Sequence, residues 1–285
     1  MSAPLTEKKE GNLAAPTRHP VEWRGPEFYD EAAFFKETER VFDICHGCRR
    51  CISLCNAFPT LFDLVDESKT MEVDGVAKAD YWKVVDQCYL CDVCYMTKCP
   101  YVPPHPWNLD FPHLMLRGKA IKFRKGETTF RDRMLTSTDR MGKLATIPVV
   151  VQAVNWASKA GFTLGVAAEA ALPPYDSRRF RATVEPSVAW PVRDGQRTPG
   201  KVALFATCYV NYNEPGIGRD LVKILSHNEI PYTIAEKEAC CGMPKLELGD
   251  LETVEKLKDV NIPALAKLAR AGYAILTAVP SCTLM

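Results

Sequence analysis

Short apolar runs alternate with helical patterns over residues 201–285. Three runs of the kind that forms buried strands are residues 201–207, 232–234 and 273–278. Residues 218–226 and 251–268 instead repeat apolar side chains at helical spacing, and Pro263 interrupts the second of these patterns. The order strand–helix–strand–helix–strand predicts an α/β domain with a small parallel sheet.

Helical patterns prevail before residue 200. Residues 29–42 and 113–172 repeat apolar side chains at helical spacing, whereas residues 173–200 are rich in Pro and Arg. Polar and charged residues interrupt the apolar stretch 147–172, so we expect no transmembrane segment there. A core or partner-facing helix is the favoured alternative, and a helix on a membrane surface is the other. We divide the chain into a disordered tail, an α-rich domain, a helical region with a linker, and the α/β domain: 1–25, 26–115, 116–200 and 201–285.

Charge and cysteine content narrow the class of protein. The net charge of +1 offers no basic field for nucleic acid, so we expect no nucleic-acid partner. Twelve cysteines in 285 residues are far above background, and no charged and apolar leader opens the chain. We therefore expect a reducing compartment, where thiols bind metals instead of forming disulfides. The expected location is cytoplasmic, either free or peripheral at the cytoplasmic face of the membrane.

Eight cysteines form two runs in which three thiols recur at every third residue. The runs are Cys45, Cys48, Cys51 with Cys55, and Cys88, Cys91, Cys94 with Cys99. Three thiolates at this spacing reach three corners of a four-iron cube, and the fourth ligand must come from elsewhere. A third thiolate so close would crowd the tetrahedron of a zinc ion, which makes zinc sites the lesser alternative. The runs predict two 4Fe–4S clusters.

This arrangement resembles two-cluster ferredoxins, in which the last cysteine of each run ligates the other cluster. The resemblance implies one cluster held by Cys45, Cys48, Cys51 and Cys99. It implies a second cluster held by Cys88, Cys91, Cys94 and Cys55. The chain departs from the ferredoxin pattern twice: Asn56 replaces a proline, and the last gap of the second run is four residues long. The long insert between the runs is similar to the all-α type of ferredoxin domain.

Residues beside the runs give further expectations. We expect His46 to form hydrogen bonds or lie exposed, because its run already supplies enough thiolates without a Rieske-type histidine. Positive charges at Arg49, Arg50 and Lys98 are expected to favour the reduced, more negative state of a cluster. Two explanations, a roof over a cluster and plain core packing, are open for the aromatic residues Phe34, Phe35 and Phe42.

Four further thiols follow the predicted strands, where open α/β sheets place their sites. They are Cys208, Cys240, Cys241 and Cys282. This pattern resembles the iron–sulfur oxidoreductases with a cysteine-rich CCG domain, such as the iron–sulfur subunit of glycolate oxidase and the corresponding subunits of heterodisulfide reductase and anaerobic glycerol-3-phosphate dehydrogenase. The closing C-x-x-C of that family ends here in Met285, and we expect the domain to be incomplete, without a second CCG half. The four thiols either hold a third iron–sulfur cluster or form a degenerate site that docks a partner.

The resemblance implies an electron-transfer iron–sulfur subunit of an oxidoreductase complex. Single electrons would pass through two 4Fe–4S clusters from a flavoprotein or dehydrogenase partner to a quinone or disulfide acceptor, with a membrane-anchor partner as a further expectation. No catalytic residue is predicted, because the five histidines are scattered along the chain. One alternative is a catalytic disulfide reductase subunit that uses the CCG site. The other is a zinc-binding structural protein.

Overall fold

The computed structural model describes residues 15–159, 172–187 and 200–283. Three predicted segments lie partly outside the described residues: 1–25, 147–172 and 173–200. Contacts divide the chain into two compact units. The first runs to Thr128 and also includes Glu247–Leu251, and the second comprises Thr129–Leu246 and the chain from Glu252 onward.

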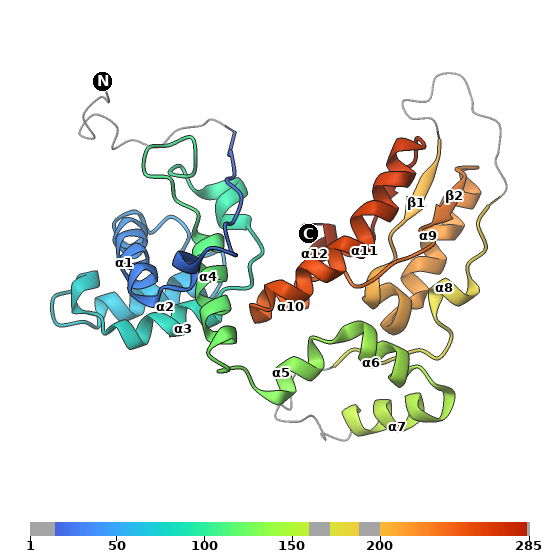
Figure 1. Cartoon of the computed structure of the whole chain (residues 1–285), viewed down its shortest axis with the longest axis horizontal. Helices are drawn as coiled ribbons and strands as arrows, with labels where there is room; N and C mark the ends of the chain where they lie inside the picture. Colours follow the sequence, from blue (N-terminus) through green and yellow to red (C-terminus); the bar gives the residue numbers. More distant parts are fainter. Residues whose placement is uncertain (1–14, 160–171, 188–199, 284–285) are drawn as a thin grey trace. The chain divides into compact units, whose positions relative to one another are not determined.

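The described elements of the first unit are helices (Figure 1). The longer ones are α1 (Glu31–Cys48), α2 (Ala57–Asp66), α3 (Tyr81–Gln87) and α4 (Phe111–Arg124). The short ones are η1 (Pro26–Tyr29), η2 (Val73–Gly75), η3 (Lys78–Asp80) and η4 (Cys94–Lys98). Helix α2 packs on α3, and α4 packs on both α1 and α3. The unit is therefore α-rich, as the sequence predicts.

Helix α1 ends inside the first cysteine run. The Asp30 carboxylate caps its start by accepting a hydrogen bond of 3.0 Å from a first-turn backbone amide. Arg49 adopts a left-handed conformation, with φ 49°, directly after the last residue of the helix. Cys45 and Cys48 therefore lie on the last turn of α1, and the turn that follows supplies Cys51.

Aromatic side chains fill the core between α1 and α3. Phe34 is fully buried and stacks on Trp82, with ring centroids 5.2 Å apart. Phe42 is also fully buried and lies 5.1 Å from the Tyr81 ring, while Phe35 contacts both Tyr81 and Trp82. Of the two explanations left open by the sequence, the structure supports core packing for these three phenylalanines.

The second unit combines helices with a small sheet (Figure 1). Its helices before the sheet are α5 (Phe130–Leu135), α6 (Thr138–Ala145), α7 (Pro148–Lys159) and α8 (Phe180–Thr183). Its strands are β1 (Val202–Leu204), β2 (Tyr232–Ile234) and β3 (Ala274–Leu276). The helices η5 (Tyr209–Asn213) and α9 (Pro215–His227) lie between β1 and β2, and α12 (Pro280–Thr283) follows β3. The helices α10 (Met243–Leu248) and α11 (Leu251–Arg270) lie between β2 and β3 and include the residues assigned to the first unit.

The sheet is parallel, with strand order β2-β1-β3. Val202 of the central strand is in register with Tyr232 on one side and Ala274 on the other. Beneath it lies a core built around Phe180, Leu204 and other buried apolar residues. The predicted strands and their parallel arrangement are confirmed, although each strand has only three residues.

Helix α11 continues through Pro263, whereas the sequence predicts an interruption there. A proline removes one backbone hydrogen bond of a helix and leaves the carbonyl four residues earlier without its donor. That carbonyl belongs to Asp259, which is exposed, as is Pro263 itself. Water can therefore replace the missing donor, and the helix is not forced to end.

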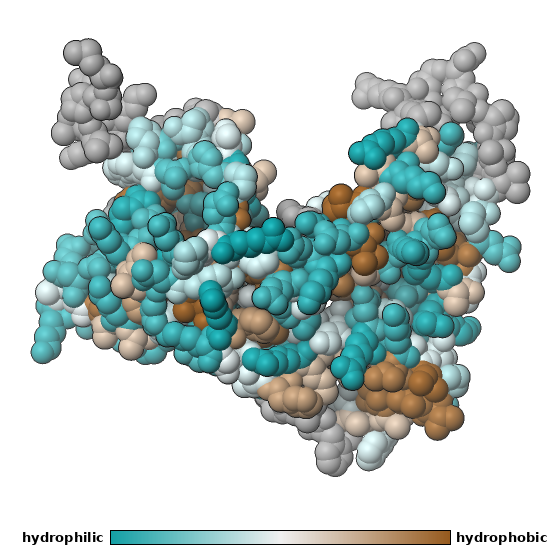
Figure 2. Space-filling model, in the orientation of Figure 1, coloured by the Kyte–Doolittle hydropathy of each residue, from teal (hydrophilic) through white to brown (hydrophobic). Residues whose placement is uncertain are grey.

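Helix α7 exposes apolar side chains rather than burying them. Val151 is its buried residue, while Val149 and Trp156 are 81% and 66% exposed. Figure 2 shows an apolar surface here, to which Leu144 and Ile147 also contribute. The described part of the stretch 147–172 is thus not a core helix. In the described residues, no helix combines the length and the apolar character needed to cross a membrane.

Candidate functional site

One pocket of the first unit is lined by thiols from both cysteine runs. These thiols belong to Cys45, Cys48, Cys51 and Cys99. The pocket is partly open to solvent, and the buried rings of Phe58 and Phe62 contribute to its wall. The end of α1 supplies two of the thiols, and the residue after η4 supplies the fourth. These are the four cysteines that the ferredoxin resemblance groups together.

The protonation of this pocket depends on burial and on repulsion between thiolates. Burial raises the pKa of the Cys45 thiol well above its usual value, and Cys99, Cys51 and Cys48 raise it further. Burial also raises the pKa of Cys99, although backbone amides oppose this shift. Cys45 and Cys99 are therefore neutral at pH 7 without a metal. A group that binds their thiolates must displace these protons, as metal binding to cysteines generally does.

The other thiols of the two runs gather around Cys94. Burial raises the pKa of Cys94 far above its usual value, and Cys88, Cys51, Cys55 and Cys91 add to the shift. Burial also raises the pKa of Cys88 to about 11, and Cys55 and Cys91 act in the same direction. The structure therefore brings the second predicted set together. Because Cys51 of the first set also lies near Cys94, the two sets are neighbours within the unit.

The described residues contain no group of three or more His, Cys, Asp or Glu side chains arranged around a single metal ion. The thiols of the first set instead line a pocket. A 4Fe–4S cube has four separate irons, so its thiolates do not converge on one atom. The pocket and its donor set therefore fit a group that accepts one thiolate at each iron.

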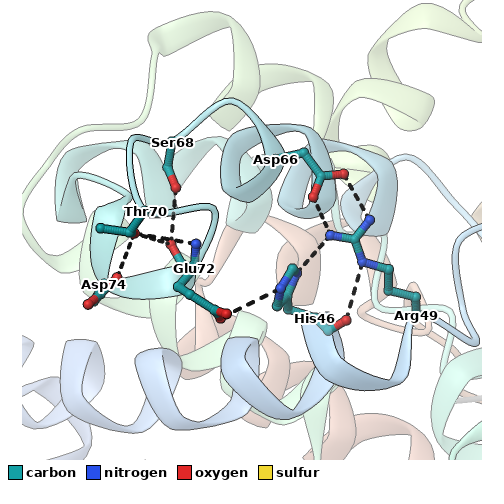
Figure 3. Close-up of polar contacts among 7 residues, drawn as sticks. All are labelled: His46, Arg49, Asp66, Ser68, Thr70, Glu72 and Asp74. Atoms are coloured by element: carbon teal, nitrogen blue, oxygen red, sulfur yellow. Dashed lines mark hydrogen bonds and ion pairs between the residues drawn. The ribbon is translucent and has the colours of Figure 1, made fainter.

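His46 takes part in a polar network beside the first run (Figure 3). Its Nδ1 atom lies 2.8 Å from a guanidinium nitrogen of Arg49, and its Nε2 atom lies 3.7 Å from the Glu72 carboxylate. Arg49 in turn forms a two-pronged ion pair with Asp66, with one nitrogen–oxygen distance of 2.8 Å. These contacts agree with the expectation that His46 forms hydrogen bonds rather than ligating iron.

The basic residues beside the two cysteine runs differ in how strongly their charge acts on the thiols. Asp66 compensates the charge of Arg49 at the surface, which weakens the expected effect of Arg49 on a cluster. Arg50 lines the four-thiol pocket, and its positive charge lowers the pKa of Cys99. Arg50 therefore favours the thiolate form of a predicted ligand. The side chain of Lys98 lies outside the described part of the chain.

Arg18 clamps the second cysteine run, although the sequence gives no signal for it. Its guanidinium donates hydrogen bonds to both oxygens of Asp92, which lies within that run, and to both oxygens of Asp110. The two bonds to Asp110 measure 2.9 Å, and the guanidinium also lies 4.3 Å from the centre of the Tyr95 ring. Burial would raise the pKa of Asp110, but hydrogen bonds from Arg18 and His113 lower it to about 2. Arg18 thereby ties the N-terminal segment to the thiol-bearing loop and to the start of α4.

The remaining four cysteines meet in the second unit. Each of the three strands is followed within a few residues by a member of this group, and the sulfur atoms are buried. The Sγ atoms of Cys208 and Cys240 are 3.7 Å apart. Cys241 shares hydrogen bonds with Cys240 and Cys282. The structure therefore brings Cys208, Cys240, Cys241 and Cys282 together, as the sequence predicts.

Protons are unevenly shared among these thiols. Hydrogen bonds from Cys208 and Cys241 lower the pKa of Cys240, and the same bonds raise the pKa values of the two donors. The hydrogen bond with Cys241 also lowers the pKa of Cys282, to about 7. Cys240 is thus the thiol whose charged form its neighbours favour. A thiolate of this kind is both a metal ligand and a nucleophile.

Side chains from two helices fix the backbone of the CCG segment. The Asp139 carboxylate of α6 accepts a hydrogen bond of 2.6 Å from the Cys240 amide. Asn261 of α11 is buried and donates a hydrogen bond of 3.0 Å to the Cys240 carbonyl. Gly242 has φ 104°, a conformation open mainly to glycine, which explains the glycine of the motif.

The buried side chain of Glu238 joins the CCG segment to α8 and to the end of β1. The Glu238 side chain is 3% exposed and lies 2.5 Å from the Arg181 guanidinium. It also accepts a hydrogen bond from the Thr207 amide, next to Cys208. The sequence analysis did not identify Glu238, because its partner Arg181 lies 57 residues away. The signal that could have pointed to Glu238 is its position two residues before the CCG motif.

The cysteine-rich segment of the second unit matches a known protein family. Residues 202–285 match the family described as Cysteine-rich domain (CCG). The match covers the sheet and all four thiols of the second unit. The resemblance inferred from those cysteines is therefore confirmed.

Curated relatives are similar over part of the chain. The C subunit of anaerobic glycerol-3-phosphate dehydrogenase from Escherichia coli (strain K12) is 26% identical over 184 residues, which are 62% of this chain and 45% of the relative. The B subunit of fumarate reductase (CoM/CoB) from Methanothermobacter marburgensis is 30% identical over 31% of this chain and 17% of its own length. Lactate utilization protein A of Shouchella clausii is 32% identical over 30% of this chain and 34% of its own length.

The match thus spans about half the length of the first of these relatives. No solved structure matches the chain significantly. Two of these relatives are named as subunits of a dehydrogenase and of a reductase, and a further relative, from Methanocaldococcus jannaschii, is named as an iron–sulfur protein, in agreement with the class that the cysteine pattern predicts.

Proposed function

We propose that this chain is an electron-transfer subunit of an oxidoreductase complex and holds two 4Fe–4S clusters. The observation that carries the proposal is the pocket of the first unit, where four thiols from two separate runs face one space beside apolar rings. The first cluster would be held by Cys45, Cys48, Cys51 and Cys99. The second would be held by Cys88, Cys91, Cys94 and Cys55.

A bound 4Fe–4S cluster supplies one-electron oxidation and reduction without transfer of a chemical group. The residues around the first set suit this task. Phe58 and Phe62 exclude water from one side of the pocket, and Arg50 offsets part of the negative charge of the thiolates. The proximity of Cys51 to Cys94 keeps the two sets of ligands close together, which favours a short path between them.

We further propose that Cys208, Cys240, Cys241 and Cys282 hold a third iron–sulfur group. Their burial, their mutual contacts and the fixed backbone around Cys240 supply four thiol ligands in a prearranged site. The similarity to subunits of a dehydrogenase and of a reductase supports a place in such a complex, and we propose a flavoprotein or dehydrogenase as electron donor and a quinone or disulfide as acceptor. We assign the protein to the reducing environment of the cytoplasm.

A second candidate function is reduction of a disulfide substrate at the cysteine-rich site. The close contact of Cys208 with Cys240 favours it, because the Cys240 thiolate has a thiol partner at 3.7 Å. This candidate predicts that Cys240→Ser abolishes turnover while the clusters of the first unit persist.

The test is an anaerobic purification and reconstitution of the full chain with iron and sulfide. We expect about eight iron atoms for the two clusters of the first unit, and further iron for the cysteine-rich site. The visible absorbance should bleach on one-electron reduction and return on oxidation. A colourless, zinc-loaded protein would contradict the proposal.

A further inference from the structure

Three buried threonine hydroxyls of the second unit have no hydrogen-bond partner of normal geometry within the described residues. They belong to Thr138, Thr207 and Thr277. A buried hydroxyl without a partner costs stability, so native proteins seldom retain one without a reason. Thr138 and Thr207 border the four thiols, which suggests such a reason.

The Thr138 hydroxyl lies beside two of the thiols. It favours the thiolate forms of Cys208 and Cys240, which lowers the pKa of each. Thr138 is the first residue of α6, and its neighbour Asp139 accepts the Cys240 amide at 2.6 Å. The hydroxyl is therefore attached to the same rigid turn that fixes the backbone of Cys240.

The Thr207 hydroxyl is held in place by a strained backbone. Thr207 has φ 60°, which is unfavourable for a β-branched residue. Its amide donates to the buried carboxyl group of Glu238, which the ion pair with Arg181 holds in place. The hydroxyl in turn lowers the pKa of the Cys282 thiol. Strain that the surroundings maintain in this way is typical of functional sites.

We propose that the hydroxyls of Thr138 and Thr207 donate hydrogen bonds to sulfur atoms of the iron–sulfur group held by the four thiols and raise its reduction potential. This inference rests on the proposed function of that site. Hydrogen bonds to sulfur stabilise the more negative, reduced state more than the oxidised state. A bound group would also provide well-placed acceptors for both hydroxyls, which have no hydrogen-bond partner of normal geometry within the described residues.

The test uses the full chain, reconstituted anaerobically and titrated with reductant while the paramagnetic signals are followed. The signal of the cysteine-rich site is the one that Cys240→Ser removes. In Thr138→Val and in Thr207→Val, its equilibrium constant for reduction should fall by about tenfold, which is about 59 mV for one electron. Iron content should remain that of the wild type. Thr207→Ser restores the hydroxyl and should return the potential toward the wild-type value.

Thr146→Val is the matched control. Thr146 is buried and lies directly after α6, the helix that begins with Thr138. Its hydroxyl already donates a hydrogen bond of 2.8 Å to the Gly142 carbonyl. This variant should leave the potential unchanged. If a valine variant does not fold, Thr138→Ala offers the same loss of the hydroxyl without added apolar volume.

Two results would overturn the inference in distinguishable ways. Threonine variants that retain all their iron and the wild-type potential would refute the role of the hydroxyls and leave the site itself intact. A Cys240→Ser chain with as much iron as the wild type would refute both the occupancy of the site and the inference that depends on it.

Discussion

Replacing Arg18 with alanine should loosen the second cysteine run. The substitution removes the hydrogen bonds that Arg18 donates to Asp92 and Asp110 and leaves two carboxylates without their shared cation. Breaking a buried ion pair costs about 3–5 kcal/mol. The side chains of Arg18, Asp92 and Asp110 are 27%, 20% and 19% exposed, so we reduce this cost to about 2–3 kcal/mol to allow for solvent screening.

Anaerobic release of iron to a chelator measures this loss. If release from the second set requires local opening of its loop, 2–3 kcal/mol accelerates it by about 30- to 160-fold. Release from the first set should change less, because Arg18 makes no hydrogen bond within the first run. Arg18→Lys should give an intermediate rate, since lysine retains the charge but lacks the planar fork.

Lys83→Ala is the control, because Lys83 pairs with Asp80 at the surface, three residues away, and the two side chains are 63% and 35% exposed. It should change the release rate by no more than about twofold, as surface pairs contribute little. An Arg18→Ala chain whose iron is released at the wild-type rate would show that the clamp does not stabilise the loop.

Three further predictions concern stability. The pKa of Asp110 is lowered from 3.8 to about 2 in the folded protein, so its charge contributes about 2 kcal/mol to the free energy of unfolding. This contribution is complete above pH 3.8 and is lost as the pH falls through 2. Urea unfolding from pH 5 to 2 should detect the loss in the wild type but not in Asp110→Asn. Phe58→Ala should destabilise the first unit by about 3–5 kcal/mol in urea unfolding and accelerate the loss of iron, because the Phe58 ring is buried. Phe130→Ala, at an 81% exposed position, should change the free energy of unfolding by no more than about 0.5 kcal/mol. Equal effects of the two substitutions would contradict the packing argument. Glu238→Gln should destabilise the second unit by about 2–4 kcal/mol in thermal unfolding, because it leaves Arg181 without its charged partner. Arg178→Ala, at the surface, should cost less than about 0.5 kcal/mol. A Glu238→Gln variant as stable as the wild type would refute the bridging role of Glu238.

Local sequence patterns predicted the positions of the thiols. The spacing of Cys45, Cys48 and Cys51 predicted that the three thiols group together, which needs no knowledge of distant residues. The structure places them on the end of a helix and the turn after it, because α1 continues to Cys48, beyond the helical pattern that the sequence shows over residues 29–42. The strand pattern likewise predicts that Cys208 and Cys282 follow parallel strands, whose carboxyl ends share one edge of the sheet. These parts of the fold and site follow from short-range periodicity.

The supporting contacts could not be predicted because they join residues far apart in sequence. Arg18 and Asp110 are separated by 92 positions, and Asp139 and Cys240 by 101. No local pattern marks which of many charged residues will meet. The continuity of α11 was also missed, because the cost of Pro263 depends on whether the freed carbonyl reaches water.

The most direct test of the central claim asks which cysteines share a cluster. Paramagnetic resonance of reduced, reconstituted chains should distinguish two centres in the first unit. We predict that Cys99→Ser weakens the same centre as Cys45→Ser, because both thiols line one pocket, and that Cys55→Ser weakens the same centre as Cys94→Ser. If Cys99→Ser instead affects the centre lost in Cys94→Ser, the exchange of ligands between the two runs is contradicted.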